Sequence, residues 1–449
     1  MNLRKSMYFG LVALRGQPLG AYYERFWRES QAGIPLDTTK QLLIKLLSHC
    51  EKSVPYYAEI MKARGDSFKE DPEEYLHSFP VLTKDIIRCN FEALKSADLP
   101  KRKWYFNTSG GSTGEPARFI QDYDYAARSG ALKLLYSRLA AGQEIGESEI
   151  RLWSSPRDMN RSSKSQMAQL VNKLANIHIL SAFRLDPETI RQHINTLNKR
   201  KPKLMVAYTS SMYEIAKFAE RNNLNVVPQN AIIVTAGTLY PYMRETIERV
   251  FQCPVYTRYG SREVGDVACE RPGRDGLWVA PWGNYVEIVD ANGNRVRDGV
   301  PGEILLTSLS NYAMPLIRYK IGDRGALSPP EANSGNEYGQ VLGQILGRTI
   351  EVFVNTKGSI VEAGYFMPLL YFRDWISRYQ VIQKSPSSVL FKIVSSGSEI
   401  PSEELDEIAS KTKLIMNDDK CEAHFEFVDE IPASDSGKFR FLVSDIRVD

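Results

Sequence analysis

The sequence predicts an α/β protein with a large N-terminal domain of mixed sheets and helices, residues 1–347, and a small α+β domain, residues 348–449. Three observations predict this division. A strand–helix–strand pattern lies in the middle of the chain, a pair of strands with turns between them follows it, and the pattern changes again after about Gly347. A chain of this length has room for several hydrophobic cores.

The first hundred residues are predicted to be mostly helical. Leucines and an isoleucine recur at helical spacing over residues 38–51. Val54-Pro55 should end that helix, because proline disfavours helical geometry in the residue before it. The segment Met1–Gly20 has no signal-peptide cleavage pattern, so we expect it to be the mature N-terminus.

A βαβ unit is predicted in the middle of the chain. Ala231–Val234 has the pattern of a buried strand, Tyr242–Phe251 that of an amphipathic helix, and Val255–Arg258 that of a second strand. This order implies that the two strands pair in parallel. Downstream, Val286–Val289 and Glu303–Thr307 are predicted as strands of a mainly antiparallel region.

The small domain is predicted to begin near Gly347-Arg348. Tyr379–Gln383 and Val389–Val394 flank a turn as in a hairpin, a helix is expected over Ser402–Ile415, and Ala423–Val428 alternates like a strand. These elements together predict an α+β domain of about a hundred residues.

Composition excludes several classes of protein. The 57 Lys and Arg nearly offset the 54 Asp and Glu and are scattered along the chain, so a nucleic-acid binder is not expected. The apolar stretches fall short of the roughly 18 residues that a membrane-spanning helix requires, so no transmembrane segment is expected. Five widely spaced cysteines form no Cys-x-x-Cys pair, which favours a reduced, cytoplasmic setting.

The segment from Thr108 to Pro116 is the sharpest local motif. Its glycines allow backbone N–H groups to approach an anion closely, and its hydroxyls can donate to phosphate oxygens. It is not a Walker A loop, because Glu115 stands where the lysine is required. A polyphosphate-binding loop and a plain surface loop both remain open for this segment. The candidate phosphate-binding residues are Thr108, Ser109, Gly110, Gly111, Ser112, Thr113 and Gly114.

Three further positions carry candidate chemistry. Glu263, in Tyr259-Gly260-Ser261-Arg262-Glu263, follows a predicted strand, where a carboxylate can hold Mg²⁺; a solvated turn glutamate is the alternative. Asp323 is expected to end an apolar strand over Met314–Asp323, where it binds a ribose or simply forms a turn. Lys438, after Ser436-Gly437, can neutralise charge on an α-phosphate or be solvated surface.

Taken in order, these segments resemble the adenylate-forming enzyme superfamily, specifically its phenylacetate–CoA ligase branch and the related CapK-type polysaccharide biosynthesis proteins. Two further stretches typical of that branch are Val54-Pro55-Tyr56-Tyr57 and Phe79-Pro80-Val81-Leu82-Thr83-Lys84-Asp85. The resemblance spans about residues 50–440. It implies an adenylate-forming fold whose small C-terminal domain is mobile and turns between two half-reactions.

The resemblance also implies roles for individual residues. The loop from Thr108 closes over the phosphates of ATP, Glu263 positions Mg²⁺, and Asp323 binds the ribose. Arg348 at the domain junction also reaches the ribose, and Lys438 is the lysine used for adenylation. The residues beside the nucleotide, by the same resemblance, are Tyr259, Gly260, Ser261 and Arg262.

The implied reaction is ATP-dependent activation of a carboxylic acid, followed by acyl transfer. The acceptor is coenzyme A or a hydroxyl or amine on a sugar, and a homodimer is a family-level expectation. The alternative is a catalytically silent nucleotide-binding or scaffold protein with the same fold. Four aromatic residues near family segments that line the acyl pocket favour a flat apolar acid, although core packing explains them equally well. They are Trp153, Tyr208, Tyr240 and Trp282.

The sequence departs from the family pattern at three places. Ile350 stands where an acidic hinge residue is usual, which bears on the second, thioester-forming conformation. Ala236–Leu239 occupies a stretch where ligases of this branch carry a glutamate, and Arg262 replaces the usual Ser or Thr. The Arg262 guanidinium could pair with an anionic substrate or with Glu263.

Overall fold

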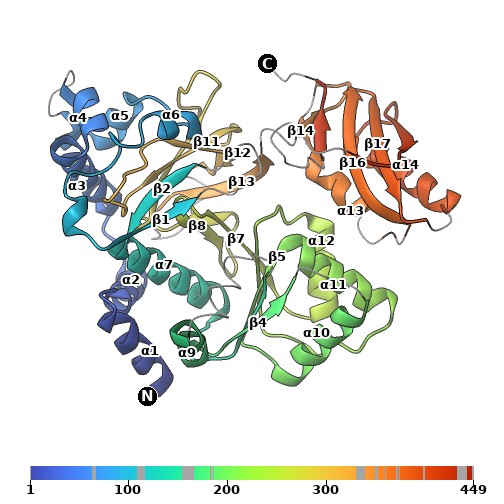
Figure 1. The fold of residues 1–449 in the computed structure, drawn as a ribbon, viewed down its shortest axis with the longest axis horizontal. Helices are drawn as coiled ribbons and strands as arrows, with labels where there is room; N and C mark the ends of the chain where they lie inside the picture. The colour runs from blue at the N-terminus through green and yellow to red at the C-terminus, as the bar shows by residue number, and fades with distance from the viewer. Residues whose placement is uncertain are drawn as a thin grey trace. The chain divides into compact units, whose positions relative to one another are not determined.

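A computed structural model gives the fold of the chain (Figure 1). The structure describes residues 2–62, 67–108, 117–153, 166–182, 185, 187–329, 339–348, 352–358, 360–370, 373, 375–397, 400–431 and 442–446. Within these ranges, no helix combines the length and the apolar character needed to cross a bilayer.

The chain divides into two compact units. The larger unit comprises Met1–Ser109, Ala117–Ile321 and Gly325–Ile345, and the smaller unit comprises Leu346–Asp449 together with the segment Gly322–Arg324.

The first hundred residues are mainly helical, as the sequence predicts. The predicted helix over residues 38–51 is confirmed, and it ends at Ser53 with Val54 as its C-cap. Pro55 then opens the next helix, because its fixed φ suits the first helical turn. The helices are α1 (Leu3–Leu14), α2 (Leu19–Ala32), α3 (Thr38–Ser53), α4 (Pro55–Lys62), α5 (Pro72–His77) and α6 (Lys84–Cys89), with short 3₁₀ turns at Ser67–Lys69 and Leu99–Lys101.

The larger unit is organised around one mixed sheet, whose strand order is β10-β11-β12-β13-β9-β8-β7-β6-β5-β3-β4. The strands are β3 (Glu149–Trp153), β4 (Ile177–Ser181), β5 (Leu204–Tyr208), β6 (Ile232–Thr235), β7 (Val255–Ser261), β8 (Gly265–Glu270), β9 (Leu277–Val279), β10 (Asn284–Val289), β11 (Gly302–Ser308), β12 (Tyr319–Leu327) and β13 (Val341–Arg348). Its helices are α7 (Tyr123–Ala141), α9 (Gln166–Ala175), α10 (Pro187–Arg200), α11 (Thr209–Arg221) and α12 (Pro241–Phe251).

The predicted βαβ unit is confirmed. Strands β6 and β7 pair in parallel, and α12 connects them. The predicted antiparallel region is also confirmed, because β10 pairs with β11 in antiparallel register. The change from parallel to antiparallel pairing occurs at β7, whose other neighbour β8 runs in the opposite direction.

Helices cover both faces of the parallel half of the sheet (Figure 1). On one face, Leu135 of α7 packs in a core with Val206 and Ile233. On the other face, Met205 and Ile232 pack in a core with residues of α10, α11 and α12. Adjacent strand residues therefore enter different cores, as the period-two geometry of a strand requires.

The predicted strand over Met314–Asp323 is wrong in its position. Residues 314–318 are irregular, and β12 begins only at Tyr319 and continues through Asp323 to Leu327. Arg318 has a left-handed backbone with φ of 50°, which no regular strand contains. Asp323 therefore lies inside a strand and does not end one.

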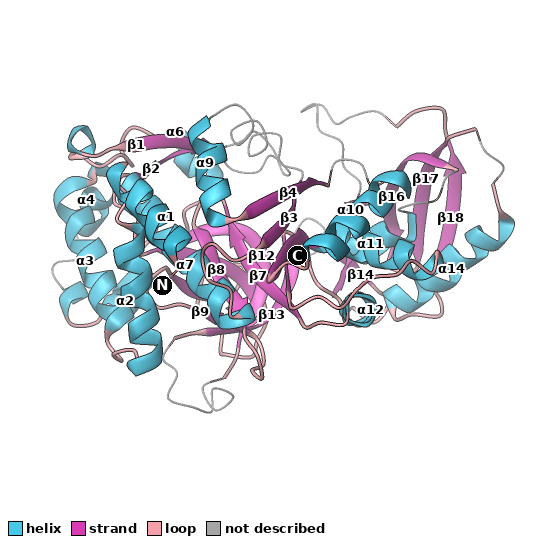
Figure 2. Ribbon diagram, turned by 90° about the horizontal axis from the view of Figure 1, so that it is seen from below, coloured by secondary structure: helices cyan, strands magenta, loops and turns pink. Residues whose placement is uncertain are grey.

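The smaller unit contains a four-stranded sheet with order β18-β17-β16-β19. Figure 2 shows β16, β17 and β18 of this sheet. The predicted hairpin is confirmed as an antiparallel pair of β16 and β17, and the predicted helix and last strand are confirmed as α14 and β18. The elements are β14 (Val352–Val354), β15 (Ile360–Glu362), a 3₁₀ turn (Ala363–Phe366), α13 (Met367–Leu370), β16 (Ile376–Ser385), β17 (Ser388–Ser395), α14 (Ser402–Met416), β18 (Glu422–Phe427) and β19 (Leu442–Ser444).

Candidate active site

The glycine-rich segment connects the two strands of a separate hairpin. Strand β1 (Trp104–Thr108) pairs antiparallel with β2 (Arg118–Asp122), and Thr108 is opposite Arg118. The backbone N–H of Thr108 donates to Asn107 Oδ1 at 2.9 Å. Residues 109–116, which include the candidates Ser109 to Gly114, lie outside the described residues, so their phosphate-binding role stays a prediction.

The turn that carries Glu263 is hydrogen-bonded to this hairpin. Gln121 Nε2 donates to the carbonyl oxygens of Arg262 and Glu263 at 2.9 and 3.1 Å. Asn107 Nδ2 donates to Gln121 Oε1 at 3.0 Å and is 3.5 Å from the Arg262 carbonyl oxygen. The strand that leads into the glycine-rich segment and the Tyr-Gly-x-x-Glu turn are therefore held side by side.

Glu263 is buried, with a relative exposure of 6%. The Tyr319 hydroxyl donates to its Oε1 at 3.3 Å. A solvated turn glutamate is thus not what the structure shows. A buried carboxylate at the end of a strand has the chemistry that Mg²⁺ prefers, with remaining ligands supplied by phosphate and water. No group of three His, Cys, Asp or Glu side chains suited to a metal occurs within the described ranges, so a metal here would depend on such outside ligands.

Two N-terminal motifs support the segment that precedes Tyr319. The Tyr57 hydroxyl donates to the Pro315 carbonyl at 3.1 Å and accepts from the Ile317 N–H at 3.2 Å. Leu82 forms a parallel bridge with Tyr319, because its N–H donates to the Arg318 carbonyl and its carbonyl accepts from Lys320. These contacts fix the irregular residues 314–318 and with them the Tyr319 side chain.

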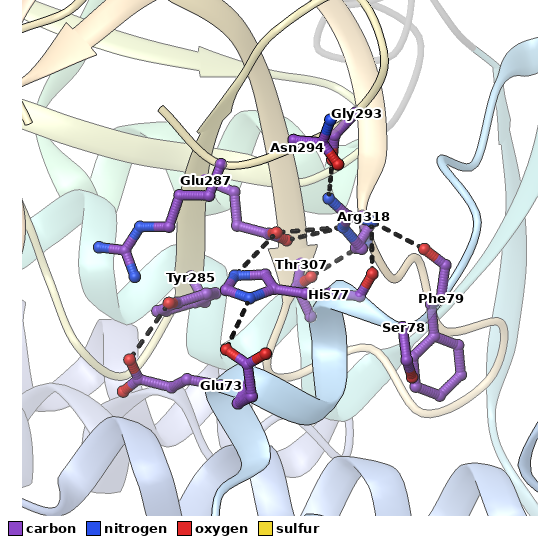
Figure 3. A network of polar contacts seen from close by, with 12 residues as sticks. Glu73, His77, Ser78, Phe79, Tyr285, Glu287, Gly293, Asn294, Thr307 and Arg318 are labelled. Atoms are coloured by element: carbon purple, nitrogen blue, oxygen red, sulfur yellow. Dashed lines mark hydrogen bonds and ion pairs between the residues drawn. The ribbon is translucent and has the colours of Figure 1, made fainter. Parts of the chain in front are cut away.

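Arg318 is the centre of a buried polar network, the Arg318 node (Figure 3). Its Nε donates to Glu287 Oε1 at 3.0 Å, its Nη1 to the Phe79 carbonyl at 2.8 Å, and its Nη2 to the Gly293 carbonyl at 2.7 Å. Thr307 Oγ1 accepts from its backbone N–H. The node thereby joins the N-terminal helices to the antiparallel strands directly beside Tyr319.

Burial raises the pKa of the Glu287 carboxyl above its ordinary value, and the Arg318 guanidinium acts in the opposite direction. The His77 ring lies at the edge of the node, and its Nε2 is 3.6 Å from Glu287 Oε1. The node is a structural ion pair whose charges are compensated inside the protein.

Gly260 is required by the packing of two strands. A Cβ at this position would lie 2.5 Å from the Gly265 carbonyl oxygen and 2.8 Å from Asp266 Cα. The register shift between Tyr259 and Gly260 marks an irregularity at the same point. The absence of a side chain is thus explained by close approach to β8, whether or not a nucleotide lies on the other side.

Ser261 and Arg262 differ in exposure. The Ser261 Oγ is buried and has no hydrogen-bond partner among the described residues, which is uncommon for a buried hydroxyl and fits a site that receives a polar ligand. Arg262 has an exposed side chain, and Gln121 Nε2 donates to its carbonyl oxygen. Tyr259 is half-buried and packs at the edge of the main core of the unit.

The remaining candidates are not brought into this cluster by the described geometry. Asp323 is partly exposed in β12, within the segment grouped with the smaller unit. Arg348 ends β13, and its side chain lies outside the description. Lys438 and the hinge position Ile350 also lie outside the described residues. The roles of these residues therefore stay predictions.

Each of the four aromatic candidates stacks on another aromatic ring. Trp153 and Tyr208 end the neighbouring strands β3 and β5, and their rings stack with centroids 4.4 Å apart. Tyr240 is buried and stacks on Tyr242. Trp282 packs on Phe26 of α2 at 4.7 Å and donates to Glu29, so core packing explains it.

Sequence reasoning missed the residues that hold the site together. Asn107 and Gln121 lie in no predicted motif, and Tyr319 lies within Met314–Asp323 without a predicted role, yet these residues position the Glu263 turn. The signal for Gln121 was available, since a polar residue amid the apolar pattern of Phe119-Ile120 indicates a buried hydrogen bond. Ala236 was noted only for its lack of a carboxylate, but its φ of 62° is rare for a non-glycine residue.

Solved structures show the class of fold. The chain matches 2-hydroxyisobutyryl-CoA ligase in its postadenylation state with a TM-score of 0.66 and 18% identity, covering 92% of this chain and 91% of that one. The same ligase in its thioesterification state matches with a TM-score of 0.58 and 19% identity, covering 92% and 91%. The chain has the fold of the adenylate-forming ligases.

Sequence relatives sharpen the resemblance. The chain is 25% identical to Protein CapK of Staphylococcus aureus over 98% of this chain and 95% of the relative. It is also 25% identical to the phenylacetate-coenzyme A ligase of Aromatoleum evansii over 66% of this chain and 67% of the relative. Residues 353–445 match the CapK C-terminal domain. The similarity to the phenylacetate–CoA ligase branch and to CapK-type proteins is thus confirmed.

Proposed function

We propose that this protein activates a carboxylic acid with ATP, forming an acyl adenylate and pyrophosphate, and then transfers the acyl group to an acceptor. The observation that carries the proposal is the convergence on Glu263. A buried carboxylate, the end of the strand that leads into the glycine-rich segment, and a Ser261 hydroxyl without a partner among the described residues meet at one turn of the larger unit.

The chemistry needs no side-chain nucleophile. The carboxylate oxygen of the acid attacks the α-phosphorus, a P–O bond forms, and pyrophosphate leaves with the electrons of the bond that breaks. Negative charge builds on the α-phosphoryl oxygens, and fixed donors nearby lower the barrier. Mg²⁺, when bound, would neutralise phosphate charge, and Glu263 is the residue that would hold it.

The other predicted residues have roles in the same proposal. The large domain, residues 1–347, binds ATP and the acid, with the loop from Thr108 to Gly114 on the phosphates and Asp323 and Arg348 on the ribose. The small domain, residues 348–449, supplies Lys438 for adenylation. We place the protein in the cytoplasm as a homodimer; the five free thiols are compatible with a reducing compartment.

Exchange of labelled pyrophosphate into ATP, screened over carboxylic acids, tests the first half-reaction. Glu263→Gln should lower the exchange rate about 100-fold, the size typical for losing one fixed electrostatic group. Lys438→Ala should have an effect of similar size, and chelation of Mg²⁺ should abolish exchange. Glu245→Gln, on the exposed face of α12, removes a carboxylate elsewhere and serves as the control.

The acceptor is tested separately by AMP release. Coenzyme A that accelerates AMP release would identify a thioester ligase. An amino sugar or glycan that does so would identify modification of a surface polysaccharide. If no acid supports exchange, the protein is instead a nucleotide-binding or scaffold protein without adenylation chemistry. Exchange that Lys438→Ala leaves unchanged would refute the role proposed for Lys438.

A further inference from the structure

A cluster of charged residues lies under α7, apart from the Glu263 turn. Helix α7 packs against β6 and β8. Figure 1 shows α7 beside β8. Lys133 of α7, Arg151 of β3, Arg258 of β7 and Asp266 of β8 interact electrostatically there, together with Glu149. We call these five residues the α7 cluster.

The α7 cluster contains more positive than negative charge. Three cations face two carboxylates, and one of these carboxylates is engaged, because Arg151 Nε donates to Glu149 Oε1 at 2.5 Å. Tyr8 of α1 also faces this pair, with a hydroxyl that burial keeps neutral by raising its pKa. Lys133 and Arg151 are partly buried, whereas Arg258 is fully buried. Buried charges in proteins are normally balanced, so the buried Arg258 needs an explanation.

Arg258 is the least satisfied member. Its exposure is only 2%, and its Nε lies 3.5 Å from Asp266 Oδ2. No hydrogen-bond acceptor among the described residues reaches its Nε or Nη1, and Asp266 Oδ2 has no donor. A guanidinium offers five N–H donors, and the two nitrogens Nε and Nη1 carry three of them, so leaving these buried without acceptors is costly.

Lys133 shares this environment. Burial and, next in size, repulsion from Arg258 lower the pKa of its ammonium to about 8, while Asp266 acts in the opposite direction. Arg258 and Lys133 come from different elements, and each carries a positive charge that its neighbours compensate only in part. An additional anion would complete that compensation.

The cluster continues from the proposed active site along two elements. Arg258 precedes Ser261 by three residues of β7, a distance of about 10 Å. On α7, Tyr125, Ser129 and Lys133 are spaced by one turn each, about 12 Å in total. The Tyr125 hydroxyl is under the electrostatic influence of Glu263 and Asp266, and Ser129 lies against Gly265.

We infer that Lys133 and Arg258 bind a second anionic group of the acid substrate, so that the acid carries negative charge at both ends. One end reacts at the Glu263 turn and the other is held by the α7 cluster about 10 Å away. This inference rests on the proposed adenylation function. It replaces the flat apolar acid that the aromatic residues suggested with a dicarboxylic or otherwise doubly anionic acid.

Binding without ATP tests the inference independently of adenylation. Dicarboxylates from succinate to sebacate are each compared with the monocarboxylate of equal chain length by thermal unfolding. A dicarboxylate of the right length should raise the melting temperature more than its monocarboxylate does. Lys133→Met should remove that difference, whereas Lys199→Met, an exposed position on α10, should retain it.

Pyrophosphate exchange then tests selectivity. The ratio of kcat/KM for dicarboxylate over monocarboxylate should fall about tenfold or more in Lys133→Met, the loss expected for a hydrogen bond to a charged group. The melting temperature of the ligand-free variant verifies that it folds. Arg258→Lys, which keeps the charge but not the planar donors, should lower the ratio less than Lys133→Met does.

Two results would overturn the inference. One is equal stabilisation by dicarboxylates and monocarboxylates at every chain length, whether or not exchange occurs. The other is equal stabilisation by a monocarboxylate mixed with free sulfate, which would mean that the cluster binds an independent anion. Absence of exchange with every acid would refute the adenylation proposal instead, since dicarboxylate binding is measured without ATP.

Discussion

Two buried arginines of the larger unit occupy opposite situations. Arg318 donates to a carboxylate and to three carbonyl groups, and its backbone N–H is bonded as well. Arg258 is equally buried, but within the described part of the chain two of its nitrogens have no acceptor, and its ion pair with Asp266 is loose. Similar burial thus accompanies complete compensation in one case and incomplete compensation in the other.

The difference separates a structural role from a binding role. A compensated charge stabilises the packing around it, and removing it leaves its partner uncompensated. An uncompensated charge destabilises the free protein and acquires its partner when a ligand arrives. Three substitutions test this comparison.

The largest effect is expected for Arg318→Met. Glu287 would remain buried without its partner, and three carbonyl groups would lose a donor, so the free energy of unfolding should fall by about 3–5 kcal/mol. Urea denaturation measures this loss. The double variant Arg318→Met/Glu287→Met should recover part of it, because both charges are then removed.

A smaller effect is expected for Arg258→Met. Asp266 would keep Lys133 as a neighbouring cation, and repulsion between Lys133 and Arg258 would disappear. The loss in unfolding free energy should be about 1–2 kcal/mol, within the common range for single substitutions. A loss as large as that of Arg318→Met would show that Arg258 is a structural ion-pair residue and would remove the contrast.

The smallest effect, with the opposite sign, is expected for Lys133→Met. The folded pKa of about 8 lies below the unfolded value of 10.5, so protonated Lys133 opposes folding below about pH 8. The variant should therefore be more stable than the native protein near pH 7, by about 1 kcal/mol.

The pH dependence gives Lys133→Met a second readout. Above about pH 8 the unfolded chain binds the proton and the folded chain does not, so the native protein gains stability as pH rises toward 10.5. The advantage of the variant should shrink over that interval. An advantage that stays constant across it would show that Lys133 is not the titrating group.

Much of the fold could be predicted because its signals are local. The periodicity of residues 38–51 and the alternation around Val389–Val394 each depend on near neighbours and gave correct elements. The strand predicted to end at Asp323 failed because Arg318 adopts a left-handed backbone that distant partners impose. Nothing within the apolar segment Met314–Ile317 signals those partners.

In the candidate site, too, contacts with residues far away in the sequence could not be predicted. Glu263 was predicted from its place after a strand, and the structure explains its burial through Tyr319 and Gln121, which lie far away in sequence. The α7 cluster could not be predicted, since Lys133, Arg151 and Arg258 are separate basic residues until the sheet and α7 assemble. Contacts between residues far apart in the sequence decide which of these charges remain uncompensated, and these contacts form only in the folded protein.

The bridge between Leu82 and Tyr319 has a consequence for biosynthesis. When Leu82 leaves the ribosome, its partner strand is still more than two hundred residues from being translated. At 5–20 residues per second this interval lasts roughly 10–50 s. During it the nascent N-terminal helices expose the apolar face that the completed sheet will cover, and a chaperone that shields this face would raise the yield of native protein.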